Sequence, residues 1–233
     1  MVRQFAEAFA TLEKMISEWE AGRDSISILE AGGGSLSKVK FAAASEVTVV
    51  DISVEQLDRN TVAAVKILGD LHSVEIESRF DAVVCYDVLE HLRDPGLVAR
   101  KLCGWLAPGG ILLVAAPNRR SLSGLITRAT PHWFHVFVYK YLFGSSNAGK
   151  PGYAPFPTVH HPDIDPLRLK LIVGSQDAMT VTALIQYQGT QRAALRQKSP
   201  IVGAVYDRVL AALGLLNPEL SESDFFLTAV KAR

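Results

Sequence analysis

Only two cysteines, Cys85 and Cys103, occur among the 233 residues of this chain. Such a composition excludes a disulfide framework and fits a reduced, cytoplasmic protein. Neither sign of charge is in excess, because 24 Lys and Arg residues balance 24 Asp and Glu residues. The sequence therefore shows no electrostatic footprint of a nucleic-acid-binding protein, and we expect no nucleic-acid partner.

Long apolar runs are also missing. None reaches about 18 uninterrupted residues, so we expect no membrane-spanning helix. Residues 1–20 are amphipathic and contain acids, which is not the pattern of a secretory signal peptide. With 48% hydrophobic and 21% charged residues, the composition is that of a globular protein. We expect a single domain over residues 1–233, with an insert at 119–165 that caps the substrate and a helical insert at 191–220 before the last strand.

A glycine cluster is the most informative local feature. A short apolar run, from Ser27 to Ala31, leads directly into glycines 32–34, which can take positive φ and bring bare backbone close to a ligand. A dinucleotide site needs a further glycine where Ser37 stands. Glu30 comes early instead, in the pattern E-x-G-x-G, and its carboxylate suits a ligand with an ammonium and a sulfonium better than a pyrophosphate. Alone, the cluster fits a plain glycine turn at a sheet edge equally well.

Apolar runs alternate with helical patterns over the first half of the chain. We expect strands at 27–31, 46–51, 65–68, 80–85 and 111–116, and helices at 5–19, 38–44, 53–60 and 97–106. This alternation predicts an α/β fold, a doubly wound parallel sheet that binds its ligand at the carboxyl ends of the strands. Asp51 ends the second strand, where its carboxylate would accept both hydroxyls of a ribose or cap the following helix.

An ordered series of motifs connects these elements: EAGGG at 30–34, Asp51, Gly69-Asp70, FDAVV at 80–84, DVLEHL at 87–92 and PGG at 108–110. The series resembles the class I S-adenosylmethionine-dependent methyltransferases, in their ubiquinone-methylase-like branch. The resemblance implies a Rossmann-like sheet of seven strands that ends in an antiparallel hairpin of residues 179–188 and 225–231. It also implies S-adenosylmethionine as cofactor, with Gly32 and Gly34 at the methionyl part, Asp51 on the ribose, Asp70 and Leu71 at adenine, and Tyr86 at the mouth. We count Glu30 and Ile52 among the cofactor-binding residues as well.

Methyl transfer to a hydroxyl needs a base, and histidine is the usual choice near neutral pH. His91 follows the fourth predicted strand, while His132, His135, His160 and His161 lie in the insert. We take His91, His135 and His160 as candidate catalytic residues, and this set favours O-methylation. For each histidine taken singly, a structural role is the alternative.

A divalent metal ion is a second hypothesis for the same region. If Asp87, Glu90 and His91 lie three and four residues apart on one helix face, their oxygen and imidazole groups would suit such an ion. A similar pattern binds metal in related methyltransferases of small RNA and of quinones. The competing interpretation, which we favour, is that Glu90 and His91 brace the helix and that no metal is required.

The insert at 119–165 is rich in aromatic residues, which fits either the core of a cap or a surface that faces the acceptor. Residues 200–216 form an apolar-faced helix pattern that would pack on the cap, on a second subunit or on a membrane surface. We therefore expect a small-molecule or lipid-linked acceptor, and peripheral membrane contact or a homodimer stays open. The alternatives are a cofactor-binding but inactive scaffold or partner subunit, and a nicotinamide-dependent oxidoreductase.

Overall fold

The computed structural model describes residues 4–150, 153–159, 161–215 and 217–233. These residues form a seven-stranded sheet in the order β3-β2-β1-β4-β5-β7-β6. The strands are β1 (Ser25–Ala31), β2 (Ala44–Asp51), β3 (Val65–Leu68), β4 (Phe80–Tyr86), β5 (Leu106–Pro117), β6 (Met179–Tyr187) and β7 (Asp224–Lys231). Strands β1 to β5 are parallel, whereas β7 runs antiparallel to both β5 and β6. The predicted fold class and its terminal antiparallel pair are confirmed.

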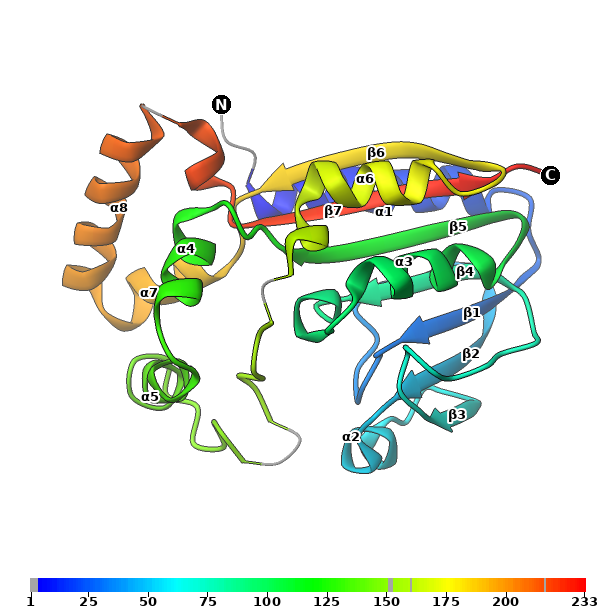
Figure 1. Cartoon of the computed structure of the whole chain (residues 1–233), viewed down its shortest axis with the longest axis horizontal. Helices are drawn as coiled ribbons and strands as arrows, with labels where there is room; N and C mark the ends of the chain where they lie inside the picture. Colours follow the sequence, from blue (N-terminus) through cyan, green and yellow to red (C-terminus); the bar gives the residue numbers. More distant parts are fainter. Residues whose placement is uncertain (1–3, 151–152, 160, 216) are drawn as a thin grey trace.

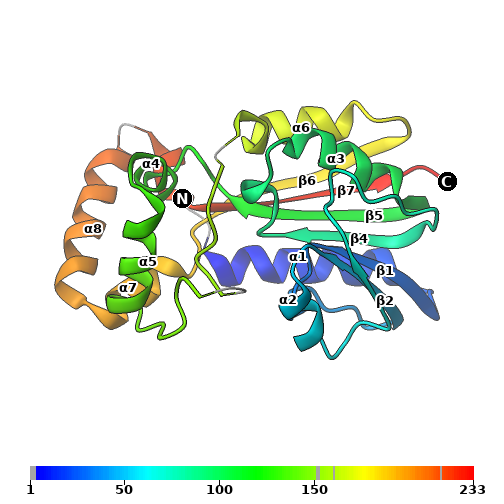
Figure 2. The ribbon, with the colours of Figure 1, turned by 60° about the horizontal axis from the view of Figure 1, so that its bottom comes forward.

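Helices cover both faces of the sheet (Figures 1 and 2). The helices α3 (Pro95–Gly104) and α6 (Pro166–Gly174) bury residues such as Leu102 and Leu169 on one face. On the other face lie α1 (Phe5–Glu20) and α2 (Val54–Arg59). Two buried clusters, one on each side of the strands, therefore hold the sheet as a rigid platform.

A second group of helices lies beyond the carboxyl ends of the parallel strands (Figure 2). It consists of α4 (Leu122–Ala129), α5 (His132–Tyr141), α7 (Gln191–Lys198) and α8 (Pro200–Gly214). We call these helices the cap. Ion pairs from Arg192 and Arg196 to Asp207 join α7 to α8. Three short 3-10 turns complete the elements: η1 (Leu89–His91), η2 (Pro162–Ile164) and η3 (Pro218–Ser221).

One predicted helix, at 38–44, is wrong. Residues 32–43 form turns, bends and irregular backbone, and β2 begins at Ala44. The apolar residues here alternate, so that Val39 is buried and Phe41 packs beside Trp19 of α1 with ring centroids 6.2 Å apart. The carboxylate of Glu20, at the end of α1, accepts hydrogen bonds from the Ala42 and Ala43 amides. Helix α1 thus covers the face that a crossover helix would have covered.

Two predicted boundaries also shift. Helix α3 begins at Pro95 rather than at 97, because the Asp94 side chain caps it by accepting from the Leu97 amide at 2.8 Å. It ends at Gly104, so that Leu106, which was expected to close the helix, begins β5. No helix within the described ranges is long and apolar enough to span a membrane.

Candidate functional site

A cavity of about 710 Å³ lies between the cap and the carboxyl edge of the sheet. Loops that follow β1 and β4 form its floor, and the cap helices form its walls. Of the candidate site residues, the lining includes Glu30, Gly32, Tyr86, His91 and His135. Such enclosed spaces at the carboxyl edge of an open α/β sheet are where ligands bind in this architecture.

The glycine loop has room only for glycine. Gly32 has φ +72° and Gly34 has φ +54°, values that L side chains rarely adopt. A Cβ at Gly32 would lie 2.5 Å from a methyl carbon of Val88, and one at Gly33 would lie 2.7 Å from Cβ of Glu30. The loop therefore keeps its backbone bare next to the cavity, as the sequence predicted.

Glu30 is a buried acid whose hydrogen bonding is incomplete. Its side chain belongs to a residue that is 4% exposed, and within the described chain Oε2 has no hydrogen-bond partner. Burial raises the pKa of Glu30 above its usual value. An unpaired carboxylate beside an open cavity is costly unless a ligand completes it, and a cationic group would do so.

Asp51 connects three loops at the edge of the sheet. One carboxylate oxygen accepts from the Gly34 amide at 3.0 Å, and the other accepts from the Ser53 amide at 2.8 Å. Its own carbonyl accepts from the Gly69 amide at 3.0 Å. The helix cap that we had weighed for Asp51 is instead Ser53, whose hydroxyl accepts from the Gln56 amide. Ile52, next along, is 73% exposed.

Asp70 is held by the histidine two residues later. The amide of His72 and its Nδ1 both reach the same oxygen of Asp70, at 2.9 and 2.7 Å. These bonds and the proximity of His72 lower the pKa of Asp70. Leu71, between them, is buried. The other described cofactor candidates, Gly34, Asp51, Ile52, Asp70 and Leu71, are not among the residues that line the cavity.

The turn after β4 differs from the helix that the sequence suggested. Asp87 has φ 56°, and its amide still pairs with the Ala115 carbonyl at 3.0 Å, so it continues the strand edge. The short turn η1 begins only at Leu89. Asp87 therefore does not share a helix face with Glu90 and His91, and the described residues contain no group of three His, Cys, Asp or Glu side chains placed to hold a metal ion.

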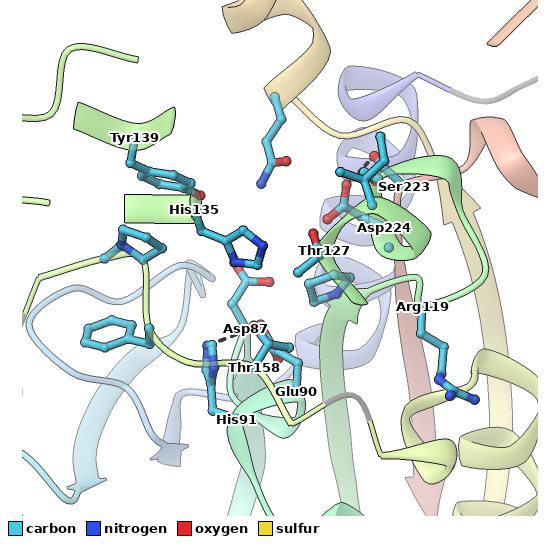
Figure 3. Close-up of a pocket in the computed structure, with 18 of the residues that line it drawn as sticks. Asp87, Glu90, His91, Arg119, Thr127, His135, Tyr139, Thr158, Ser223 and Asp224 are labelled. Carbon is cyan, nitrogen blue, oxygen red and sulfur yellow. Dashed lines mark hydrogen bonds and ion pairs between the residues drawn. The ribbon is translucent and has the colours of Figure 1, made fainter. Parts of the chain in front are cut away.

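Acidic groups nevertheless gather on the cavity floor (Figure 3). Asp87 is open to the cavity, yet the surrounding protein and the carboxylate of Asp224 raise its pKa to about 6, against the effect of Lys38. Glu90 is 4% exposed, and burial followed by the charge of Asp87 raises its pKa well above the usual value. Burial also raises the pKa of Asp224.

His91 binds an irregular segment, residues 153–159, which we call the strap. Its Nδ1 donates to the Pro157 carbonyl at 2.7 Å, and the Val159 amide donates to the Glu90 carbonyl at 2.8 Å. Phe156 packs edge-on against the imidazole, with ring centroids 5.8 Å apart. Burial lowers the pKa of His91. One ring nitrogen of His91 therefore holds the strap, while its Nε2 lies 3.7 Å from Oε1 of Glu90.

Among the described residues, Nδ1 of His135, which lines the cavity, has no hydrogen-bond partner. The Thr130 hydroxyl donates to the Ile126 carbonyl at 2.8 Å, so its oxygen can only accept from His135 Nε2, also at 2.8 Å. The proton therefore sits on Nε2, and Nδ1 keeps its lone pair. Burial lowers the pKa of His135, so the ring is neutral near pH 7. His160, the third candidate, lies outside the described residues.

Sequence reasoning missed Asp224, Ser223 and Tyr139. Asp224 begins β7, and because β7 is antiparallel its first residue meets the carboxyl ends of the parallel strands. Had the predicted hairpin been used in this way, Asp224 would have been found. The Ser223 hydroxyl donates to its carboxylate at 2.6 Å. Tyr139 comes from α5, and nothing in the sequence places that helix against the sheet.

The family described as "Methyltransferase domain" matches residues 29–114, from β1 to β5. Two curated relatives are named ubiquinone biosynthesis O-methyltransferase. The one from Proteus mirabilis is 32% identical over 97 residues, which are 38% of this chain and 40% of the relative. The one from Psychrobacter arcticus is 28% identical over 142 residues, 54% of this chain and 51% of the relative. The chain thus matches about half the length of these relatives or less.

Solved structures share the fold over nearly the whole chain. The plantazolicin methyltransferase BpumL, in complex with SAH, has a TM-score of 0.57 at 11% identity and covers 97% of this chain and 84% of its own. The [4+2]-cyclase SpnF also has a TM-score of 0.57, at 14% identity, with 98% and 84% covered. Magnesium protoporphyrin IX methyltransferase from Synechocystis PCC 6803, with bound SAM, scores 0.52 at 12% identity, with 96% and 79% covered. At such identities the likeness is one of fold alone.

Proposed function

We propose that this chain, which carries a methyltransferase domain over residues 29–114, transfers the methyl group of S-adenosylmethionine to the hydroxyl of a small-molecule or lipid-linked acceptor. The observation that carries the proposal is the bare glycine loop beside the buried carboxylate of Glu30, whose Oε2 has no hydrogen-bond partner within the described residues. A cofactor with an ammonium and a sulfonium completes that carboxylate, whereas the pyrophosphate of a nicotinamide cofactor would be repelled by it.

The residues of the loop edge fit this cofactor. Gly32 and Gly34 would face its methionyl part, and Glu30 its ammonium. Asp51 would take the ribose hydroxyls, because its carboxylate already stands at the tip of β2 beside the loop. Ile52, Asp70 and Leu71 would meet the adenine ring, and Tyr86 would close the mouth. The exposed side chain of Ile52 supports this position for adenine, because the adenine ring would cover it.

S-adenosylmethionine, when bound, supplies an electrophilic methyl group. The protein must then place the acceptor, exclude water and take up the hydroxyl proton. Nδ1 of His135 is the base that we propose, because its lone pair is free and its ring is neutral at pH 7. The cap and the strap shield the site from water. The names of the curated relatives support transfer to oxygen.

Replacing His135 with alanine is expected to lower the rate of methyl transfer by about 100-fold or more, while S-adenosylmethionine still binds, because general base catalysis contributes on that order. Rates would be measured with methyl-labelled S-adenosylmethionine on a panel of phenols and long-chain alcohols, by the mass of the product. In the parent protein the rate should fall as the pH drops through the pKa of His135, below its usual 6.5.

Two threonine variants sharpen this test. Thr130 and Thr11 each donate to the carbonyl four residues earlier at 2.8 Å, but only Thr130 also accepts from His135. Thr130→Val should slow transfer several-fold, since the tautomer is no longer fixed, and Thr11→Val should not. Unchanged rates in both His135→Ala and Thr130→Val would contradict this base. Cofactor binding without transfer to any acceptor would favour an inactive scaffold.

The free thiols of Cys85 and Cys103 support a reducing compartment such as the cytoplasm. A homodimer or peripheral contact with a membrane stays a prediction. Exposed apolar residues along α8 motivate it, among them Ile201 and Val205.

A further inference from the structure

The cavity holds more carboxyl groups than its proposed cofactor uses. Among the described residues, four carboxyl groups line it, those of Glu30, Asp87, Glu90 and Asp224. The cofactor brings an ammonium and a sulfonium but also a carboxylate, so it adds a single net positive charge. Glu30 alone accounts for that charge. The other three acids line the same cavity and are left for the acceptor.

The basic residues of the lining do not neutralise these acids. Arg192 pairs with Asp207 and with the side-chain oxygen of Gln188. The side chain of Arg119 extends away from the acids in Figure 3. Lys38 is near enough to lower the pKa of Asp87, but it is exposed at the cavity rim and burial still outweighs it.

Glu90 is independent evidence that a ligand binds here. The residue is 4% exposed, it lines the cavity, and throughout the described chain its Oε2 finds no hydrogen-bond partner. Buried polar atoms are rarely left in this state without a ligand or water. Asp87, in the turn after β4, and Asp224, the first residue of β7, open into the same space (Figure 3).

Aromatic rings line the same cavity as these carboxyl groups. Tyr139, Tyr86 and Tyr206 all line the cavity, and the charge of Asp224 contributes to a raised pKa in each. For Tyr86 burial and then Asp87 raise the pKa to about 12. Carboxylates together with the faces of neutral tyrosine rings are the chemistry that recognises an organic ammonium group.

A metal ion does not fit the same residues. A divalent cation needs several oxygen or nitrogen ligands within about 2.0 to 2.6 Å of one point. Across the described ranges, no three acidic or metal-ligating side chains converge in that way. The acids surround a wide space instead of a point, which suits a larger organic cation.

We propose that the methyl acceptor carries an ammonium group, which binds between Asp87 and Asp224 beside the ring of Tyr139. This inference rests on the proposed function, and it narrows the acceptor to a hydroxyl compound that also bears an amine. The hydroxyl would face His135 while the ammonium reaches the two carboxylates.

Three probes of similar shape test the charge preference: tyramine, 4-ethylphenol and 3-(4-hydroxyphenyl)propionate. Their binding would be measured by calorimetry with and without S-adenosylhomocysteine. Tyramine should bind about tenfold more tightly than 4-ethylphenol, because each charge-assisted hydrogen bond contributes on that scale. The propionate should bind least.

Matched variants assign the preference to the two acids. Asp87→Asn suits the site because asparagine tolerates positive φ, and Asp224→Asn keeps an oxygen for the Ser223 hydroxyl. Each variant should bind tyramine about as tightly as 4-ethylphenol. Glu18→Gln, which changes an exposed acid on α1, should keep the preference for tyramine. Thermal melting confirms that each variant folds.

Equal binding of tyramine and 4-ethylphenol by the parent protein would overturn the inference, as would an unchanged preference in both variants. Saturable Mg²⁺ binding that displaces tyramine would replace it with a metal site. Failure of S-adenosylhomocysteine to bind would instead contradict the proposed function, and the probe titrations without it keep the two failures distinct.

Discussion

Replacing Asp51 with alanine is expected to weaken S-adenosylmethionine binding by about 100-fold or more. The carboxylate holds the Gly34 amide on one oxygen and the Ser53 amide on the other, so its loss frees the glycine loop from β2. It also removes the proposed acceptor for the ribose hydroxyls. Two hydrogen bonds to a charged group correspond to an effect of this size. Calorimetric titration of the variant and the parent measures it.

Asp58 provides the matched control, because it is an exposed acid on α2 a short distance along the same chain segment. Asp58→Ala should bind the cofactor like the parent protein. If Asp51→Ala bound within about threefold of the parent, the ribose role of Asp51 and its support of the loop would both be wrong.

Replacing Gly32 with alanine is expected to be the most damaging small substitution in the loop. The residue has φ +72°, which costs a non-glycine residue roughly 1 to 2 kcal/mol. The new Cβ would also lie 2.5 and 2.7 Å from the two methyl carbons of Val88, and such overpacking costs roughly 1 to 3 kcal/mol more. We expect the melting temperature to fall by roughly 5 to 15 °C, with loss of measurable cofactor binding.

Gly104 is the control for this change, because a Cβ there would meet no atom within 4 Å. Gly104→Ala should be neutral or slightly stabilising, since alanine is the better helix former. The double variant Gly32→Ala with Val88→Ala relieves the clash but not the φ strain, so it should recover only part of the lost stability. A Gly32→Ala protein with the melting temperature and the cofactor affinity of the parent would contradict the claim that the loop has room only for glycine.

The sheet could be predicted because its strands carry their own signals. Runs such as 80–85 and 111–116 are apolar enough to be buried on both faces, and each ends at the ligand edge. The helix expected at 38–44 failed for a nonlocal reason. Helix α1, far earlier in the chain, covers the sheet face that this helix would have covered. Its Glu20 carboxylate holds the segment by a hydrogen bond from the Ala42 amide. Local propensity contains no information about such a contact.

Some residues of the candidate site could be predicted from local sequence, and others are placed only by tertiary contacts. The glycine loop follows β1, and Asp51 and Tyr86 end β2 and β4, so their places at the sheet edge could be inferred from spacing. Asp224 reaches the cavity only through the antiparallel direction of β7. The separate roles of His91 and His135 depend on the strap and on Thr130, whose contacts are made in three dimensions.

Titration of the purified protein with S-adenosylmethionine and S-adenosylhomocysteine is the most direct test of the central claim. We predict that both bind at a single site with micromolar affinity, and that Asp51→Ala and Gly32→Ala each abolish or greatly weaken that binding. No binding by the parent protein would contradict an S-adenosylmethionine-dependent function for this site.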